Sequence, residues 1–237
     1  MQFEINKVLT ADDIAKMMDL SCVRTYSNES DIKMLVESAK KYNCGQVSVM
    51  QCFIPMTKEL LRDRTDIKVI GNVSFPSGSD STSIKLAQAK EMLGEGCGEL
   101  DMVINVGKLR SGSFSEVEED VKAVVGIAKN VPVKVIIEIS LLTHHEVEKA
   151  CEICINSGAA FVKTGTGWMT KGTTFEDIKL LKSIVGNDIK IKASGGVKDL
   201  DMLVEMYKLG AVRFGVNLAS GKSILNECIA RGSQVGL

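Results

Sequence analysis

Histidine, proline and aromatic residues are scarce in this chain of 237 residues, which holds 2 histidines, 3 prolines and 5% Phe, Trp and Tyr. The two histidines, His144 and His145, are adjacent in the sequence. Neighbouring side chains on a helix diverge and do not converge on one ion. The carboxylates form no cluster that resembles a metal site either, so we expect no bound metal.

Neither sign of charge is in excess, since 29 Lys plus Arg face 30 Asp plus Glu for a formal net charge of −1. Without a basic excess, little drives the release of counterions from a phosphate backbone, and we expect no nucleic-acid partner. No apolar run approaches the roughly 18 to 20 residues that span a bilayer, so we expect no membrane partner either. Residues 1–12 contain Glu4, Lys7 and Asp12 and lack the basic segment and apolar core of a secretory signal. We therefore expect a cytoplasmic location.

The 7 cysteines do not suggest a disulfide framework, because their number is odd and their spacing irregular. Cys151 and Cys154 form a C-x-x-C motif inside a predicted helix over Thr143–Asn156. No second cysteine pair or Cys/His partner stands at the spacing of a zinc site. We expect both cysteines to be buried thiols, the usual state of free cysteine.

The 21 glycines punctuate short apolar runs rich in β-branched residues. These runs are the predicted strands: Met17–Ser21, Gln46–Met50, Ile67–Val73, Glu99–Asn105, Val133–Ile139, Phe161–Thr164, Ile189–Ala193 and Val212–Gly215. Segments between them have the apolar period of a helix. They are Asp31–Tyr42, Ser83–Leu93, Ser115–Ala128, Thr143–Ile155, Thr174–Val185, Leu200–Leu209 and Ala219–Ala230. Several helices are preceded or opened by a Ser or Thr followed three residues later by Glu, the capping-box pattern. The pairs are Ser115 with Glu118, Thr143 with Glu146 and Thr173 with Glu176.

The order of these elements predicts a parallel barrel. Strands such as VKVIIEI (133–139) are apolar nearly throughout, which favours a parallel sheet covered on both faces. Eight βα units in 237 residues match the size of a (β/α)8 barrel, whereas a doubly wound sheet usually has fewer strands. No linker or shift in composition divides the chain. The sequence therefore predicts an α/β fold with a single (β/α)8 TIM-barrel domain over residues 1–237.

Three charged residues, Asp101, Lys163 and Lys192, stand in apolar predicted strands near the carboxyl ends, where such barrels carry their chemistry. A lysine there is either part of a buried ion pair or a reactive amine whose pKa is lowered by burial and a neighbouring cation. The strands of Lys163 and Lys192 are neighbours in a barrel, so each lysine would disfavour protonation of the other, as Schiff-base chemistry requires. The spacing by itself favours neither explanation.

The residues around these positions resemble the 2-deoxyribose-5-phosphate aldolase family of class I aldolases, and the resemblance covers nearly the whole chain. It runs through MDLS (18–21), SFPSG (74–78), ELDMVINVGKLRSG (99–112), KVIIEISLL (134–142), FVKTGTGW (161–168), KASGGVKD (192–199) and RFG (213–215). The ELDMVIN, VKT and KASGG motifs, in this order on the fourth, sixth and seventh predicted strands, are its most specific part.

The resemblance implies a lyase that reversibly cleaves 2-deoxy-D-ribose 5-phosphate to D-glyceraldehyde 3-phosphate and acetaldehyde, in nucleoside salvage. Lys163 would form the Schiff base with the donor aldehyde. Lys192 would keep Lys163 deprotonated and, with Asp101 as acid/base partner, relay protons. Because a protonated imine withdraws electrons by itself, this chemistry needs no cofactor.

In barrels of this kind, backbone N–H groups after the seventh and eighth strands commonly hold a phosphate. Lys198 would add a cation where the family more often has Arg. The residues that the resemblance assigns to the substrate and its phosphate are Ser21, Thr164, Gly167, Ser194, Gly195, Gly196, Lys198, Gly215 and Asn217.

The chain departs from the family after the eighth predicted strand, where Asn217 and Leu218 replace two usual serines. One alternative is that backbone N–H groups still bind the phosphate. Another is an aldolase of the same family with a different or non-phosphorylated aldehyde or sugar substrate. A third, a non-catalytic sugar-phosphate binder, is disfavoured, because a binder has no need of two buried lysines.

Four further residues carry weaker expectations. Asp19 is expected to be either structural or close to the substrate. Glu138 is expected either to orient donors of a loop or to pair with a lysine such as Lys134, and of these the core ion pair is favoured. Arg213 stands beside the phosphate loop, although strand alternation would point it away. Trp168 either forms a wall of the substrate pocket or only packs against its neighbours.

The expected partner is a small-molecule aldehyde or sugar phosphate. Since barrels often dimerise, we also expect the protein to form a homodimer.

Overall fold

All eight predicted strands form, with ends shifted by a few residues at most. The computed structural model describes residues 8–236, so the part of the secretory-signal expectation that rests on residues 1–7 lies outside the described residues. The strands are β1 (Val8–Thr10), β2 (Met18–Cys22), β3 (Gln46–Val49), β4 (Lys68–Val73), β5 (Glu99–Val103), β6 (Val133–Ile136), β7 (Phe161–Lys163), β8 (Lys190–Ser194), β9 (Ala211–Asn217) and β10 (Gln234–Gly236).

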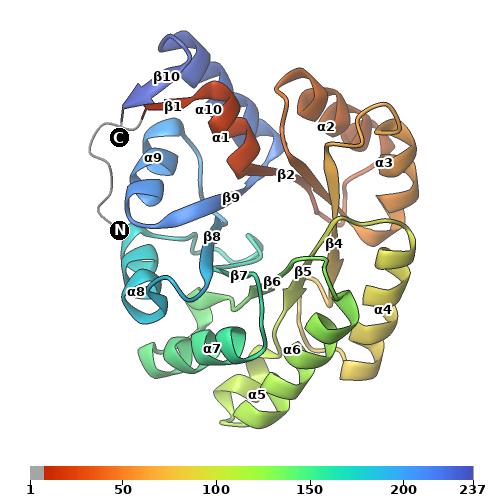
Figure 1. Cartoon of the computed structure of the whole chain (residues 1–237), viewed down its shortest axis with the longest axis vertical. Coiled ribbons are helices and arrows are strands. Elements are labelled where there is room, and N and C mark those ends of the chain that lie inside the picture. Colours follow the sequence, from red (N-terminus) through yellow and green to blue (C-terminus); the bar gives the residue numbers. More distant parts are fainter. Residues whose placement is uncertain (1–7, 237) are drawn as a thin grey trace.

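Strands β2 to β9 pair in sequence order and in parallel, and β9 pairs back onto β2, which closes the barrel. Helices surround it (Figure 1). Every residue of β5 and of β6 is buried, as expected for parallel strands covered on both faces. The predicted (β/α)8 barrel is confirmed.

The seven predicted helices are present, and shorter ones join them. The helices are α1 (Ala11–Met17), α2 (Glu29–Lys41), α3 (Ile54–Leu60), α4 (Thr82–Gly94), α5 (Val106–Arg110), α6 (Phe114–Ala128), α7 (His144–Asn156), α8 (Phe175–Val185), α9 (Leu200–Lys208) and α10 (Leu218–Ala230), with the 3-10 turns η1 (Gln51–Phe53) and η2 (Ile139–Leu141). The sequence did not predict α1, α3 and α5, which are too short to show a clear apolar period. Cys151 and Cys154 are free, buried thiols in α7, as predicted.

One of the predicted capping boxes is confirmed and one is wrong. Thr143 accepts a hydrogen bond from the backbone N–H of Glu146, whose side chain bonds back to Thr143. Ser115 and Glu118 form no such box, because α6 begins earlier, after Ser113, whose side chain makes no capping bond.

The third predicted box is displaced by one residue. Thr174 and Asp177 cap α8, in place of Thr173 and Glu176. Thr173 is buried instead, and its hydroxyl donates to the carbonyl oxygen of Ser194 at 2.9 Å. The side chain that the pattern assigned to the helix therefore joins the helix to the β8 loop.

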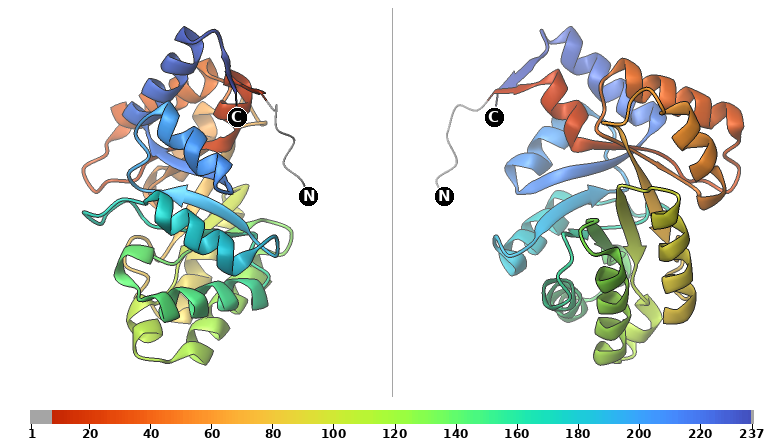
Figure 2. Two further views of the ribbon diagram at one scale, coloured as in Figure 1. Left: turned by 90° about the vertical axis from the view of Figure 1, so that its left-hand side faces the viewer. Right: turned by 45° about the vertical axis from the view of Figure 1, so that its right-hand side comes forward.

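The first and last described strands pair with each other and lie outside the barrel sheet. Strand β10 runs antiparallel to β1, and the two lie side by side in both views of Figure 2. Helix α1 leads from β1 into the amino end of β2, while α10 runs back from the carboxyl end of β9. This pairing therefore holds residues 234–236 at the end of the barrel opposite the strand carboxyl ends.

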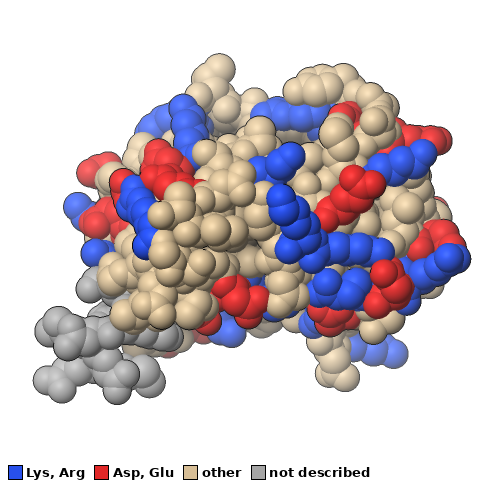
Figure 3. All heavy atoms as spheres, turned by 90° about the horizontal axis from the view of Figure 1, so that it is seen from above, with Lys and Arg blue, Asp and Glu red and all other residues tan. Residues whose placement is uncertain are grey.

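Basic and acidic side chains are interspersed on the face shown in Figure 3, in keeping with the formal net charge of −1. Within residues 8–236, no helix is both long and apolar enough to span a membrane.

Candidate active site

The three charged residues singled out in the sequence meet inside the barrel. Lys163 Nζ and Lys192 Nζ both donate to Oδ2 of Asp101, at 2.8 and 2.7 Å. The two lysines are register partners on β7 and β8. Their Nζ atoms are therefore at most 5.5 Å apart, the sum of the two distances to the shared oxygen. The relative exposures of Asp101, Lys163 and Lys192 are 0%, 5% and 1%, so water screens this charge cluster poorly.

Four further charged groups extend the cluster toward the amino ends of the strands. Lys134 Nζ lies 2.9 Å from Oδ1 of Asp101 and 2.5 Å from Oε2 of Glu99. Asp19 Oδ2 lies 2.5 Å from Lys192 Nζ. Arg213 bonds to Glu99 and to the side chain of Gln46, so it points away from the phosphate loop.

This cluster holds more cations than carboxylates. Lys134, Lys163, Lys192 and Arg213 face the carboxyl groups of Asp19, Glu99 and Asp101. Since buried charges are stable only when paired, one of the cations is held less firmly than the others. Lys163 is that cation, because Asp101 is the carboxylate that it contacts and the other lysines contact Asp101 as well.

The pKa values follow this imbalance. Burial lowers the pKa of Lys163 to about 8, and the charges of Lys192 and Lys134 act in the same direction, against the attraction of Asp101. Burial alone would raise the pKa of Asp101, but Lys134, Lys163 and Lys192 outweigh it and hold that pKa well below the usual range. Burial alone would lower the pKa of Lys134, but the charges of Asp101, Asp19 and Glu99 outweigh it and raise that pKa. The pKa of Lys163 is thus lowered, whereas that of Lys134 is raised.

Glu138 anchors the loop that follows Lys163 at the end of β7. The carboxylate of Glu138 accepts hydrogen bonds from the backbone N–H of Thr166 at 3.2 Å and from its hydroxyl at 2.5 Å. The expectation of an ion pair between Glu138 and Lys134 is wrong, because Glu138 leaves the strand in a left-handed conformation with φ of 50°. A Cβ on Gly165 would lie 2.6 Å from Oε1 of Glu138, so a larger residue at this position would displace the Glu138 carboxylate.

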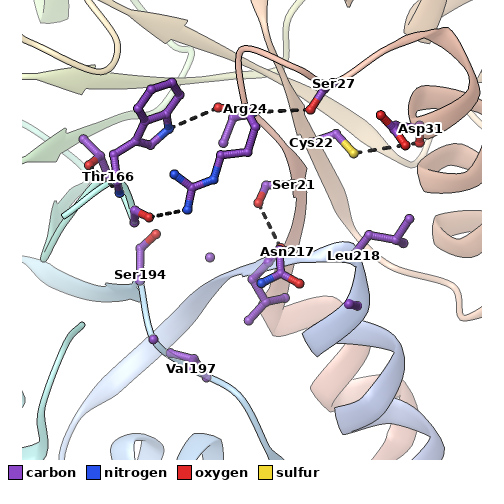
Figure 4. A pocket seen from close by; sticks show the side chains of 18 of the residues that line it. Ser21, Cys22, Arg24, Ser27, Asp31, Thr166, Ser194, Val197, Asn217 and Leu218 are labelled. Atoms are coloured by element: carbon purple, nitrogen blue, oxygen red, sulfur yellow. Dashed lines mark hydrogen bonds between the residues drawn. The ribbon is translucent and has the colours of Figure 1, made fainter. Parts of the chain in front are cut away.

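A cavity of about 550 Å³ lies over the carboxyl ends of the strands (Figure 4). Most residues assigned to the substrate and its phosphate line it: Ser21, Gly167, Ser194, Gly195, Gly196, Gly215 and Asn217. A small inner pocket continues from it, sharing Ser21, Ser194 and Gly215, and reaches Lys163 and Lys192. The site residues are therefore gathered around one connected space.

Two of the assigned residues do not line the cavity. Thr164 is fully buried, and its hydroxyl accepts a hydrogen bond from the backbone N–H of Ser194 at 2.9 Å, so it supports the β8 loop. Lys198 is exposed beyond Val197 and does not line the cavity. Asn217 does line it, but its side-chain oxygen accepts from the backbone N–H of Ser220 and caps α10.

Sequence reasoning missed several residues that line this space. Arg24 and Lys222 line the cavity, and Ser48, Asn72 and Phe75 line the inner pocket. Arg24 follows the carboxyl end of the first barrel strand, so the rule that located Asp101 could have found it. Among residues 8–236, no group of three or more His, Cys, Asp or Glu side chains is placed to hold a metal ion.

Comparison with known proteins gives one consistent result. The sequence model of the DeoC/LacD family aldolases matches residues 13–227. A deoxyribose-phosphate aldolase of Sinorhizobium medicae is 40% identical over 222 residues, covering 94% of this chain and 90% of the relative. One of Caldicellulosiruptor saccharolyticus is 41% identical over 222 residues, covering 92% of this chain and all of the relative (100%).

Solved structures agree. QR15, an aldolase, is 34% identical with a TM-score of 0.87 and covers 93% of this chain and 97% of its own. A tetrameric deoxyribose phosphate aldolase of Aeropyrum pernix is 26% identical with a TM-score of 0.85, over 93% of this chain and 92% of its own. With the barrel and its site already described, these matches identify the chain as a lyase that belongs to the DeoC/LacD family of aldolases.

Proposed function

We propose that this protein reversibly cleaves 2-deoxy-D-ribose 5-phosphate to D-glyceraldehyde 3-phosphate and acetaldehyde through a Schiff base on Lys163. The observation that carries the proposal is the buried amine of Lys163, with its pKa lowered to about 8 beside Asp101 and Lys192. At pH 7.5 about a quarter of such an amine is neutral, against about one part in a thousand for a lysine with the ordinary pKa of 10.5. The neutral amine is the nucleophile that imine formation requires.

In the first step, neutral Lys163 Nζ attacks the aldehyde carbon C1 of the open-chain sugar. The carbinolamine takes up a proton on its hydroxyl and loses water, which leaves a protonated imine. Lys192 donates that proton, and Asp101 carries protons between the two lysines because both contact its Oδ2. Since its pKa is held low, Asp101 remains a carboxylate between transfers.

In the second step, the bond between C2 and C3 breaks. The C3 hydroxyl gives its proton to the Lys192 amine, which became neutral when it protonated the carbinolamine, and becomes the aldehyde of D-glyceraldehyde 3-phosphate. The electron pair of the broken bond forms the C1–C2 double bond of an enamine. The protonated imine nitrogen accepts the displaced charge. Lys192 then gives its proton to C2, and addition of water to the imine releases acetaldehyde and free Lys163 and returns one proton to Lys192.

The phosphate lies, in this proposal, against the backbone N–H groups of Gly195, Gly196 and Gly215 and the first turn of α10, which begins at Leu218. A helix N-terminus with glycine-rich backbone is a competent anion site without side-chain hydroxyls. The apolar Leu218 side chain is the observation that favours the alternative, a non-phosphorylated acceptor. A common kinetic experiment separates the two.

The test is the release of aldehyde from 2-deoxyribose 5-phosphate and from 2-deoxyribose, measured with the wild type and with Lys163→Met. We expect the wild type to prefer the phosphorylated sugar and the variant to lose about 1,000-fold or more in kcat. Lys179→Gln, at an exposed position on α8 away from the cavity, is the matched control. Equal rates on both sugars would favour the alternative, and an active Lys163→Met variant would refute the Schiff base at this residue.

We also propose nucleoside salvage in the cytoplasm as the setting, because a phosphorylated deoxy sugar arises from nucleoside breakdown and its charge keeps it inside the compartment where it forms. A homodimer is the proposed assembly, as the commonest symmetric oligomer. The related aldolase of Aeropyrum pernix is a tetramer. Light scattering on the purified protein gives the mass that decides between these states.

A further inference from the structure

The phosphate side of the cavity lacks the cation that the sequence led us to expect. Asn217 uses its side-chain oxygen to cap α10 and keeps its NH2 group, and Leu218 is apolar. Lys198, the cation expected beside the phosphate, does not line the cavity. A dianionic phosphate held by backbone N–H groups alone would leave its charge without a cationic partner.

Arg24 occupies the opposite wall, where two contacts orient its exposed side chain. Its Nη2 donates to the carbonyl oxygen of Gly167 at 2.7 Å, and its guanidinium lies 5.3 Å from the centre of the Trp168 ring. Trp168 is itself held, because its indole N–H donates to the carbonyl oxygen of Val23 at 3.1 Å and Phe75 packs edge-on against it with ring centres 6.0 Å apart. The arginine is therefore preorganised before any ligand arrives.

Most of the hydrogen-bonding capacity of Arg24 remains available. A guanidinium has five N–H donors, and the bond to Gly167 uses one of them. Within residues 8–236, no carboxylate forms an ion pair with Arg24 or with Lys222, the second cation on the cavity wall. The carboxylate that lines the same cavity, Asp31, accepts the backbone N–H of Asn28 in the capping box of α2. The cavity wall thus carries two unpaired positive charges against one engaged negative charge.

The side chain of Arg24 points into the cavity. Figure 4 shows the guanidinium of Arg24 inside the cavity, above Ser194 and facing the wall that carries Ser21 and Asn217. An anion bound to the backbone N–H groups after β8 and β9 would have these groups on one side and the Arg24 guanidinium on the other. Arginine suits this position because its planar fork binds two phosphate oxygens at once.

We infer that Arg24 binds the substrate phosphate and, with Lys222 as a second charge, replaces the two serine hydroxyls that Asn217 and Leu218 have displaced. This inference rests on the proposed function. Phosphate binding then depends on the positive charges of the β2–α2 loop and of α10, so its affinity should fall as ionic strength rises.

The experiment compares wild type, Arg24→Gln and Arg24→Lys on 2-deoxyribose 5-phosphate and on 2-deoxyribose. For Arg24→Gln we expect kcat/KM on the phosphorylated sugar to fall about 10- to 100-fold, mostly through KM, as for loss of one charge-assisted bidentate contact. On 2-deoxyribose we expect a change of less than about twofold, since no phosphate is present. Arg24→Lys keeps the charge without the fork and should recover part of the loss.

Two further variants complete the comparison. Trp168→Phe removes the indole bond to Val23 that holds the ring beside the guanidinium, so we expect a loss smaller than that of Arg24→Gln and confined to the phosphorylated sugar. Lys179→Gln removes one exposed charge outside the cavity and should change neither rate. If Arg24→Gln loses the same factor on both sugars, Arg24 is a loop support and the inference is wrong; no loss on either sugar also refutes it.

Failure of the proposed function gives a different pattern. Acetaldehyde needs no phosphate site, so borohydride should trap it on Lys163 equally in wild type and Arg24→Gln. If the wild type neither traps acetaldehyde nor cleaves the sugar, calorimetric binding of glycerol 3-phosphate still tests Arg24. We expect Arg24→Gln to weaken that binding about tenfold or more, and unchanged binding would overturn the inference.

Discussion

Replacing Lys192 by methionine should move the pH dependence of imine formation upward. The Nζ atoms of Lys163 and Lys192 lie at most 5.5 Å apart, from their 2.8 and 2.7 Å contacts with one oxygen of Asp101. At an effective dielectric constant of about 20, two like charges at this separation repel by about 3 kcal/mol. That energy changes the protonation equilibrium constant of Lys163 about a hundredfold or more. Loss of Lys192 should therefore shift the rising limb of the pH profile by about two pH units.

The sign follows from which form reacts. The neutral amine attacks the aldehyde, so the rate rises with pH through the pKa of Lys163, which is about 8 in the wild type. The methionine variant removes a cation that favours the neutral form, and the rate should then rise only at higher pH. At pH 7.5 the neutral fraction should fall by roughly two orders of magnitude.

The assay is the initial rate at which borohydride traps acetaldehyde on the protein, measured from pH 6 to 10. The midpoint of the profile reports the pKa of the amine, whereas its height also reflects proton donation by residue 192. Lys85→Met is the matched control, because Lys85 is fully buried and pairs with Asp120 outside the site. A profile with its midpoint unchanged in Lys192→Met would refute the electrostatic account of Lys163.

Three further predictions follow from the same contacts. Because the pKa of Lys163 is lowered from 10.5 to about 8 on folding, Lys163→Met should gain up to about 3 kcal/mol in unfolding free energy at pH 7. The gain should vanish as pH rises toward 10.5. Urea denaturation at both pH values checks this, and a loss of stability at pH 7 would contradict it. Glu138→Ala removes the hydrogen-bond acceptor for Thr166 and should lower kcat about ten- to hundredfold. Glu138→Gln keeps an acceptor oxygen and should recover most of the lost kcat. Equal loss of kcat in both variants would contradict a positioning role. Lys85→Met leaves Asp120 as an unpaired buried charge and should reduce the unfolding free energy by about 3 to 5 kcal/mol, with kcat of the folded protein unchanged. Thermal denaturation measures this, and an unchanged melting temperature would show that the pair contributes little.

The parts of the fold that sequence predicted are those with strong apolar patterns. The strands are buried on both faces, so their runs of Val, Ile and Leu stand out, and the longer helices show a clear period. Helices such as α3 and α5 are held by the loops around them and show no such pattern. The end of β6 was predicted too late because nothing in VKVIIEI signals that Glu138 takes a left-handed conformation.

The site was predictable where a charge stands in an apolar strand. Asp101, Lys163 and Lys192 were found in this way, and the barrel brings them together as expected. Outside these strands, the particular partner that a side chain meets was not predictable. Glu138 binds Thr166 on the next loop, and Arg24 is held by Trp168, which is distant in sequence. Such pairings follow from the closure of the barrel and leave no periodic mark in the sequence.

The central claim is that Lys163 is the amine that forms the imine, and trapping tests it most directly. The protein is incubated with acetaldehyde and borohydride, and its intact mass and peptide map are compared with those of Lys163→Met. The account predicts one reduced ethyl adduct, located on Lys163 and absent from the variant. An adduct of the same yield in the variant, or no adduct in the wild type, would contradict it.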